Sequence, residues 1–376
     1  MINIFNLNNS AKNLKNIVNK INFNETAWVN GGEIKNLEKQ TRKILKTKKE
    51  VCTCNSGSDA LLLALQHLKR KDKDIIITTP ISYIASSSIA KFLGYEIIYI
   101  DVDINNYLLD LDKLDNFLKN INKKIKSRIA GVIFVELFGN TGDLKKLSKI
   151  CNKYKIWSLG DCAQSLGTEY NNKSSLDYYD FAISSFYPTK IISAYGDGGI
   201  IFLPQKFKNK FEMLKNNGHN LTDKTKCELL GINSRLDTIQ AYILNHKIKN
   251  FKNYLIHNRK NFKIYNKNLK NFLKLPELNK KSSTNGYLYS FRIDKKLVKN
   301  FLNFMKINGI EARQFYARSL PENKVLKPII KTDLRNAKKC SAEIISIPSR
   351  ASLNNYEKNK ILDTIKNFFN NSNKIN

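Results

Sequence analysis

The chain is poor in the residues that mark several common classes of protein. Its 376 residues include only 7 Pro, 16 Gly and 2 Trp, while 42% of them are hydrophobic. Collagen-like, low-complexity and disordered proteins are therefore excluded, because this composition provides enough apolar material for a large core. The length predicts one large domain and a smaller one.

Cysteine is also scarce, and the 6 cysteines contain no C-x-x-C pair. Free thiols in a reducing compartment are expected rather than disulfides or a zinc site, and the 4 histidines have no metal-ligand spacing. The N-terminus lacks a basic stretch followed by an apolar one, and no run reaches the ~18 apolar residues of a membrane-spanning helix. We expect a cytoplasmic protein without a membrane partner.

Acidic residues are outnumbered: 32 Asp and Glu stand against 64 Lys and Arg, a formal net charge of +32. Such a charge is typical of proteins that bind nucleic acid. The lysines, however, are spread over almost the whole chain and mixed with Asn, without a basic tail or an RNA-binding aromatic motif. Genome base composition explains this surface, since Lys and Asn have adenine- or thymine-rich codons. A basic nucleic-acid-binding protein remains the alternative of a different class.

Between residues 51 and 203, short β-rich runs alternate with segments of helical period. Strands are predicted over 51–54, 75–79, 96–100, 130–135, 156–159 and 199–203, and helices over 59–68, 84–93, 111–120 and 143–154. Continuous apolar strands separated by helices predict a parallel sheet covered on both faces. Its ligand site is expected outside the carboxyl ends of the strands.

A long helix is predicted to begin at residues 233–237. Ser234 and Asp237 have the spacing of a capping box. Leu236, Ile239 and Ile243 are predicted to form the apolar face of this helix.

Beyond about residue 250 the chain becomes more basic and aromatic, and the alternation of strands and helices weakens. We therefore assign residues 1–249 to a large α/β domain that binds the ligand. Residues 250–376 are assigned to a smaller α+β domain.

Two polar turns follow predicted strands. In Asn55–Asp59, free backbone N–H groups, the helix dipole and the Ser58 hydroxyl form a cradle for phosphate, with an ordinary N-cap turn as the alternative. Asp161 follows the strand at 156–159, where a buried carboxylate needs a cationic partner such as a protonated pyridine nitrogen. A buried aspartate bonded to loop amides is the alternative there.

Lys190 ends the segment 184–190, and a Gly-rich segment at 194–199 leads into the next strand. Its apolar and small neighbours desolvate the amine, as a carbonyl-trapping lysine requires. The chain has no G-x-G-x-x-G turn, Walker loop or G-x-S-x-G elbow. A carbonyl-trapping lysine, an aspartate for a ring nitrogen and a phosphate cradle together predict pyridoxal 5'-phosphate (PLP).

Eight motifs resemble, in their order, the DegT/StrS family of nucleotide-sugar aminotransferases over residues 51–245, and the similarity extends more weakly over most of the chain. They are Ser-Gly-Ser-Asp-Ala at 56–60, Pro80–Ser86, Asp101-Val-Asp103, Leu137-Phe-Gly139, Asp161-Cys-Ala-Gln164, Ser185–Lys190, Tyr195-Gly-Asp-Gly-Gly199 and Gly231-Ile-Asn-Ser-Arg235. The resemblance implies a PLP-dependent transferase of fold type I. In that α/β fold, a large, mostly parallel sheet domain with helices on both faces precedes a smaller α+β C-terminal domain.

The resemblance also implies the roles of individual residues. Lys190 and Asp161 are catalytic: the lysine binds the cofactor covalently and the aspartate pairs with its ring nitrogen. The other cofactor-binding residues are Gln164 and Tyr83 at the ring, Gly57, Ser58, Asp59 and Ser185 around the phosphate, and Asn233 from a neighbouring subunit. That last role implies a homodimer with shared active sites. Arg235, Tyr316 and Arg318 stand where the family binds substrate.

Several positions depart from the family pattern. They are Ile191-Ile192-Ser193 in place of Asn-Leu-Gly, Glu136 in place of His or Ser, Asn140 in place of Gln, and Phe315-Tyr-Ala-Arg318 in place of a His-Tyr-Pro segment. The cofactor chemistry is untouched by these changes, but the identity of the sugar is not determined.

The function implied is transfer of an amino group from an amino acid, L-glutamate by expectation, to a keto-sugar nucleotide. The motifs are most similar to members that act on carbon 3 of UDP-linked 2-acetamido-3-keto sugars such as the glucuronate, for surface polysaccharide such as O-antigen. A carbon-4 aminotransferase for a 4-keto-6-deoxy sugar nucleotide is the alternative within the family. A dehydratase, which carries histidine in place of the lysine, and a non-enzymatic regulator on the same fold are further alternatives.

Overall fold

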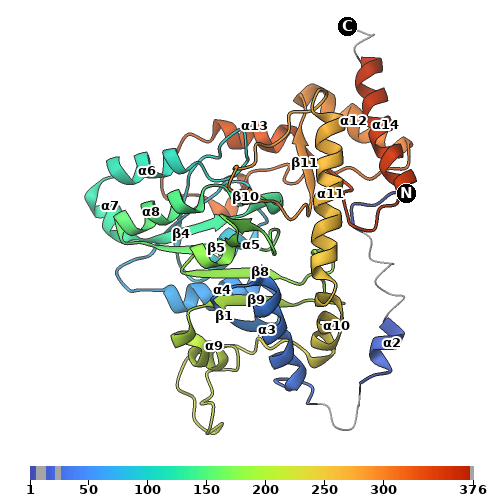
Figure 1. Cartoon of the computed structure of the whole chain (residues 1–376). Helices are drawn as coiled ribbons and strands as arrows, with labels where there is room; N and C mark the ends of the chain where they lie inside the picture. Colours follow the sequence, from blue (N-terminus) through green and yellow to red (C-terminus); the bar gives the residue numbers. More distant parts are fainter. Residues whose placement is uncertain (6–13, 22–26, 373–376) are drawn as a thin grey trace.

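The computed structural model describes residues 1–5, 14–21 and 27–372. Its centre is a seven-stranded sheet with the order β1-β9-β8-β5-β4-β2-β3 (Figure 1). The strands are β1 (Glu50–Cys54), β2 (Ile75–Thr78), β3 (Glu96–Tyr99), β4 (Ile129–Val135), β5 (Trp157–Asp161), β8 (Phe181–Ser185) and β9 (Gly199–Leu203). Only β9 runs antiparallel to its neighbours, β1 and β8. The predicted large, mostly parallel sheet is confirmed.

Helices cover both faces of this sheet. Every residue of β4 is buried, and successive side chains of a strand point to opposite faces, so neither face of its centre is open to solvent. Helix α3 (Gly32–Leu45) precedes β1. The helices that come after β1 in the chain are α4 (Gly57–Leu68), α5 (Ala85–Phe92), α6 (Leu111–Asn120), α7 (Lys123–Arg128), α8 (Leu144–Tyr154), α9 (Lys208–Leu214) and α10 (Thr238–Ile248). Asp143 caps α8 by accepting a hydrogen bond from Lys146 N at 3.0 Å, as its sequence position predicts.

A smaller unit is built on an antiparallel pair of strands, β11 (Tyr289–Arg292) and β12 (Ile344–Ile347). Its helices are α11 (Phe251–Leu269), α12 (Lys295–Ile307), α13 (Arg335–Glu343) and α14 (Asn355–Ser372). In Figure 1, α11 runs from the end of α10 beside the large sheet up to this smaller unit. The remaining elements are α2 (Leu14–Val18) and a small sheet of β10 (Ser282–Ser283), β6 (Glu169–Tyr170) and β7 (Lys173–Ser174). Short 3₁₀ helices are η1 (Leu137–Gly139), η2 (Ser175–Tyr178), η3 (Gln205–Phe207), η4 (Leu320–Glu322) and η5 (Lys324–Leu326).

Two hydrophobic clusters form the interior. The larger surrounds the seven-stranded sheet and takes in Leu320, Leu326 and Ile344 from late in the chain. The smaller surrounds β11 and β12 and takes in Ile2 from the beginning. The division of the chain between residues 249 and 250 therefore stays a prediction, because each cluster includes segments from both sides of it.

The prediction for the start of α10 is wrong. The helix begins at Thr238 after Asp237, whose side chain makes no capping bond, and Ile239 is exposed. Ser234 is buried and donates a hydrogen bond to Asp59 Oδ2 at 2.8 Å. Its hydroxyl therefore bonds to a residue far away in the sequence and does not cap the helix. The chain stays extended up to Asp237 because Asp237 pairs with Val29.

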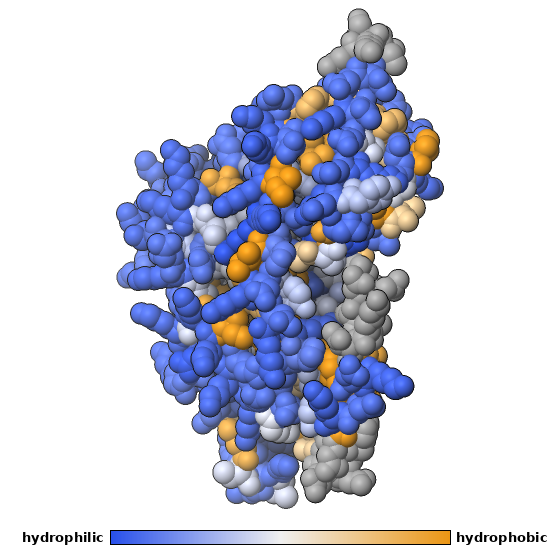
Figure 2. All heavy atoms as spheres, turned by 45° about the vertical axis from the view of Figure 1, so that its right-hand side comes forward, coloured by the Kyte–Doolittle hydropathy of each residue, from blue (hydrophilic) through white to orange (hydrophobic). Residues whose placement is uncertain are grey.

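The cysteines are free thiols, as expected, and all except Cys227 are buried. None of the helices in the described part of the chain has the length and apolar character needed to cross a membrane. On the face shown in Figure 2, the surface is mostly hydrophilic, and the hydrophobic residues on it form small, separate groups.

Candidate active site

A cavity of about 720 Å³ opens at the carboxyl ends of the sheet strands. Asp161 and Ser185, the last residues of β5 and β8, both line it, and the turn after β1 contributes residues 56–58. The carboxyl ends of parallel strands meet at one edge, so motifs far apart in the chain converge here. Tyr316 and Arg318, from late in the chain, line it too.

The turn between β1 and α4 offers backbone donors to an anion. Ser56 caps α4 by accepting a hydrogen bond from Asp59 N at 3.0 Å, and the next residues begin the helix at the cavity. The first N–H groups of a helix have no partner within it, and the helix dipole is positive at that end. The hydroxyls of Ser58 and Ser185 belong to the same wall. This wall fits the phosphate of the predicted cofactor.

Replacing Gly57 by Ala is expected to weaken cofactor binding about tenfold or more. An added Cβ at this position lies 2.8 Å from Ser185 Cβ, so the two sides of the phosphate wall must move apart. Titration of PLP into apo-enzyme measures the change. Gly32→Ala is the matched control, because nothing lies within 4 Å of a Cβ added at that helical glycine. Equal PLP affinity in the two variants would contradict the role of the Gly57 turn.

Asp161 is buried, and its carboxyl group accepts two hydrogen bonds. Ser86 Oγ donates to its Oδ2 at 2.7 Å, and Ala163 N donates to its Oδ1 at 3.2 Å. Burial raises the pKa of Asp161, although these two hydrogen bonds and the nearby Lys190 oppose the shift. A carboxylate in this state is stabilised by a further cation. The protonated ring nitrogen of PLP fits that need.

Lys190 stands at the end of a turn in which its N–H donates to Tyr187 O at 2.8 Å. Its Nζ lies 5.6 Å from the centre of the Tyr287 ring. Burial lowers the pKa of Lys190, and the charge of Asp161 only partly opposes this shift. A lysine with a lowered pKa has more of its amine in the neutral, nucleophilic form, which suits it to attack a carbonyl carbon.

Gln164 and Tyr316 line the cavity and are joined by a hydrogen bond. Gln164 Nε2 donates to the Tyr316 hydroxyl at 2.9 Å, while its Oε1 accepts from Phe138 N at 2.9 Å. Both hydrogen bonds fix the plane of the Gln164 amide beside Asp161. Tyr83 lines the same cavity with more than half of its surface exposed, so its ring is free to stack on a planar ligand.

Three residues from the predicted set do not reach this cavity within one chain. Asp59 accepts the hydrogen bond from Ser234, and Asn233 is exposed and pairs through its backbone with Asn216. Arg235 donates from a terminal nitrogen to Asn216 Oδ1 at 2.9 Å, while its Nε is buried without a partner. The roles of these three residues stay predictions.

Sequence reasoning missed Ser86 and Tyr287 as site residues. Ser86 lies at the end of the motif Pro80–Ser86, in the first turn of α5, and Tyr83 lies just before that helix. Tyr287 lines the cavity and contacts Lys190, yet it lies 97 positions beyond it in the printed sequence and belongs to no motif. No local signal identifies a contact of that kind.

Glu136 is a second buried carboxyl, placed behind the site. It accepts hydrogen bonds from Tyr179 at 2.8 Å, Thr168 at 3.1 Å and Ser175 at 3.2 Å. Burial raises its pKa from 4.5 to about 7, despite these hydrogen bonds. The folded protein therefore holds this proton more tightly than the unfolded chain between these two pH values.

Glu136→Gln is expected to be more stable than the wild type above pH 7 and nearly equal to it at pH 5. The raised pKa means that ionisation of Glu136 costs stability as the pH rises from about 4.5 past 7, by up to about 3 kcal/mol. The neutral glutamine avoids this cost. Urea unfolding at pH 5 and pH 8.5 tests the difference, with exposed Glu277→Gln as control. A gain that is independent of pH would refute this explanation.

One cluster has the residue types of a metal site. Ligand atoms of Glu38, Cys52 and Glu212 lie within 4.8 Å of one another. Lys208 Nζ, however, is 2.7 Å from both carboxylates, and Lys215 Nζ is 2.9 Å from Glu212. Burial raises the pKa of Cys52 to about 12. The carboxylates are already neutralised and the thiol is protonated, so the cluster is an ion network.

The sequence is similar to a known family of enzymes over most of its length. A model of the DegT/DnrJ/EryC1/StrS aminotransferase family matches residues 9–366. The UDP-2-acetamido-2-deoxy-3-oxo-D-glucuronate aminotransferase of Pseudomonas aeruginosa is 28% identical over 85% of this chain and 86% of its own length. The dTDP-4-amino-4,6-dideoxy-D-glucose transaminase of Shigella dysenteriae is 24% identical over 90% of each.

The fold has relatives among solved structures as well. A DegT DnrJ EryC1 StrS aminotransferase from Brucella abortus superposes with a TM-score of 0.89 over 96% of both chains, at 24% sequence identity. At that identity the likeness establishes the fold.

Proposed function

The chain belongs to the DegT/DnrJ/EryC1/StrS aminotransferase family, and from this premise we propose that it moves an amino group from glutamate to carbon 3 of a UDP-linked 2-acetamido-3-keto sugar. It is an enzyme, and the aminotransferases of this family depend on PLP. The observation that carries the proposal is the convergence of Lys190, Asp161 and the phosphate wall on one cavity. A role in making surface polysaccharide and a cytoplasmic location belong to the same proposal.

PLP, when bound, supplies the electron sink that amino transfer requires. In this chain the N-terminus of α4, with Ser58 and Ser185, is assigned to its phosphate. Asp161 is assigned to the ring nitrogen, which it keeps protonated. Gln164 and Tyr83 are assigned to the edge and the face of the ring. These residues place the ring against Lys190 and restrict its movement, which favours reaction by positioning.

Lys190 performs the proton transfers in this proposal. Its amine takes the proton from the α-carbon of the amino donor. In the second half of the reaction it delivers a proton to the carbon of the sugar that receives the amino group. The lowered pKa of Lys190 suits both tasks, because the amine must alternate between its neutral and its charged form near neutral pH.

The substrate side of the cavity contains the cations that a sugar nucleotide needs. Arg313 and Arg318 line it, and Arg313 is paired with Glu311. Arg318 is exposed, and no ion pair to it occurs among the described residues. A guanidinium in that position suits a diphosphate or a carboxylate, which accept two parallel hydrogen bonds.

Carbon 3 is preferred to carbon 4 on the strength of the Pseudomonas relative, whose name specifies a 3-oxo sugar. The Shigella relative, a transaminase of a 4-amino sugar, supports the alternative. Purified enzyme is to be given glutamate with a UDP-3-keto sugar or with a 4-keto-6-deoxy sugar nucleotide, and 2-oxoglutarate release is measured. We expect release with the first substrate, whereas release with the second alone would favour the carbon-4 reaction.

The active sites are proposed to be shared between two subunits. Asn233 and Arg235 lie outside the cavity of their own chain, and the buried Nε of Arg235 has no partner there. In a homodimer these residues reach the cavity of the partner subunit. A basic nucleic-acid-binding protein, the alternative of a different class, gains no support from this cavity.

Mixing inactive Lys190→Ala with inactive Arg235→Ala protomers is therefore expected to restore activity. A mixed dimer has one site that lacks both residues and one that is wild type, so random exchange gives about a quarter of wild-type activity. Subunit exchange is verified by native mass spectrometry before the assay. Absence of recovery after exchange would show that each chain builds its own site.

A further inference from the structure

The loop that follows Lys190 is attached to α10 at two points. Gln240 Oε1 accepts from Tyr195 N at 2.8 Å, and Gln240 Nε2 donates to Tyr195 O at 3.1 Å. Lys247 Nζ donates to Ser193 O at 2.7 Å and to Ser193 Oγ at 3.2 Å. Gln240 and Lys247 are seven residues apart, about two turns, so both project from the same side of the helix.

Lys247 makes a further contact with this loop. Its Nζ lies 4.4 Å from the centre of the Tyr195 ring, within the range of a cation–π interaction. Between the attachments and Lys190, the side chain of Ile192 is buried and fixes the middle of the loop. The loop is thus held at Ser193 and Tyr195 by a helix that contributes nothing to the 720 Å³ cavity.

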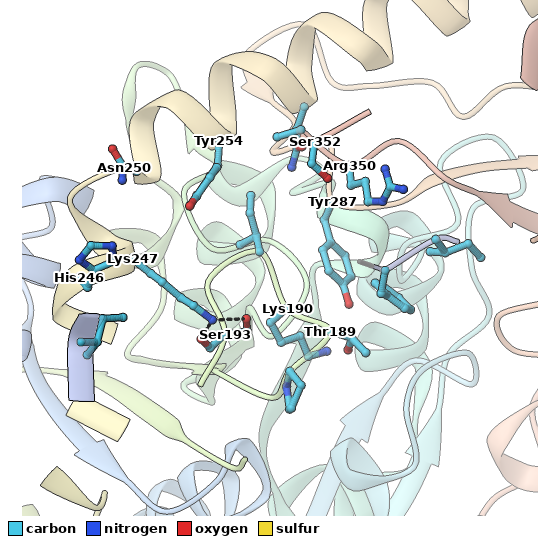
Figure 3. A pocket seen from close by; sticks show the side chains of 17 residues that line it. Thr189, Lys190, Ser193, His246, Lys247, Asn250, Tyr254, Tyr287, Arg350 and Ser352 are labelled. Carbon is cyan, nitrogen blue, oxygen red and sulfur yellow. Dashed lines mark hydrogen bonds between the residues drawn. The ribbon is translucent and has the colours of Figure 1, made fainter. Parts of the chain in front are cut away.

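A second cavity, of about 230 Å³, adjoins the first and shares Thr189, Lys190 and Tyr287 with it. Figure 3 shows Lys247 reaching across it from α10 to Ser193, next to the loop that bears Lys190. Lys190 lines both cavities, whereas Lys247 lines only the second. The Lys247 ammonium therefore lies outside the 720 Å³ cavity and borders only the second one.

The charged and titratable groups around Lys247 come from several elements. They are His246 on α10, Tyr254 on α11, Tyr195 and Lys190 on the loop, and Tyr287 and Arg350 near the smaller unit. No carboxylate among the described residues lines this cavity. Burial lowers the pKa of Lys247 to about 8.

We propose that Lys247 is a positioning residue for Lys190: through Ser193 and Tyr195 it fixes the loop that directs the Lys190 amine toward the cofactor. This role rests on the proposed function, in which Lys190 is the catalytic lysine. The ammonium form binds Ser193 by charge-assisted hydrogen bonds, which are stronger than those of a neutral amine. The restraint is consequently strongest below pH 8 and weakens as Lys247 loses its proton above it.

Hydrogen–deuterium exchange of the full-length holoenzyme tests the restraint without relying on activity. In Lys247→Met, the amides of residues 190–195 are expected to exchange about tenfold faster than in the wild type at pH 7, the size expected when a charge-assisted hydrogen bond is lost. Lys249→Met is the matched control, because Lys249 is exposed at the end of the same helix. Lys247→Arg, which stays charged, is expected to keep slow exchange up to pH 9. Equal exchange in Lys247→Met and Lys249→Met overturns the proposal.

Steady-state kinetics test the effect on catalysis. Lys247→Met is expected to lower kcat about tenfold and to leave the KM for glutamate unchanged, because Lys247 does not line the substrate cavity. If kcat is unchanged and borohydride still attaches the cofactor to Lys190, the positioning role is overturned and the proposed function is kept. Attachment to another lysine in the wild type overturns the proposed function as well, so the two failures are distinguishable.

Discussion

Lys190→Ala is expected to reduce amino transfer by roughly 10⁴-fold or more, since both covalent attachment of the cofactor and proton transfer are lost. The fold is expected to survive. Asp161, whose charge interacts with Lys190, keeps its hydrogen bonds from Ser86 and Ala163 when the amine is removed. Turnover with glutamate and circular dichroism measure the two effects. Lys206→Ala, a change at an exposed lysine, is the control and should retain full activity.

Chemical labelling identifies the lysine directly. Borohydride reduction of the wild-type holoenzyme is expected to leave the cofactor attached to the peptide that contains Lys190. The nearest lysines on either side are Lys173 and Lys206. An adduct on either of them, with Lys190 unmodified, would contradict the assignment.

Asp161→Asn is expected to lower turnover by roughly 10³-fold or more while most of the cofactor stays bound. The amide is neutral and no longer favours a proton on the ring nitrogen, so the ring accepts electrons less readily. The phosphate wall is unchanged by this substitution, because it is formed by the N-terminus of α4 with Ser58 and Ser185. Turnover and cofactor content per subunit are the measurements.

Ser86→Ala is the matched control for this substitution. It removes the 2.7 Å hydrogen bond to Asp161 Oδ2 but leaves the carboxylate in place. A loss of about tenfold is expected, the size typical of one hydrogen bond to a charged group. If Asp161→Asn were no slower than Ser86→Ala, the charge of Asp161 would have no part in the reaction.

The fold was largely predictable from the sequence because its signals are local. The run Ile129–Val135 is apolar throughout, as a strand covered on both faces must be, and it is buried at every position. Asp143 begins an amphipathic helix in the sequence and caps that helix in the structure. The order of strands and helices then places Asp161 and Lys190 at one edge of the sheet, since parallel strands share the edge at which they end.

Other features were decided by contacts between distant residues. Ser234 has the spacing of a helix cap, but Asp59, 175 positions away, takes its hydrogen bond and α10 begins later. Asn233 and Arg235 carry family motifs yet lie outside the cavity of their own chain. A local sequence pattern indicates which hydrogen bonds a side chain can form. The tertiary structure determines which partner lies within reach of that side chain.

The environment of Lys190 shows both contributions. The sequence around it indicated a carbonyl-trapping lysine, because apolar and small residues flank Lys190 and a Gly-rich segment follows at 194–199. Only the tertiary structure brought the Tyr287 ring to 5.6 Å from its amine and Lys247 to the loop behind it. The local sequence determines which reactive side chain stands at each strand end. Burial, which lowers the pKa of Lys190, and orientation arise only when remote segments pack around it.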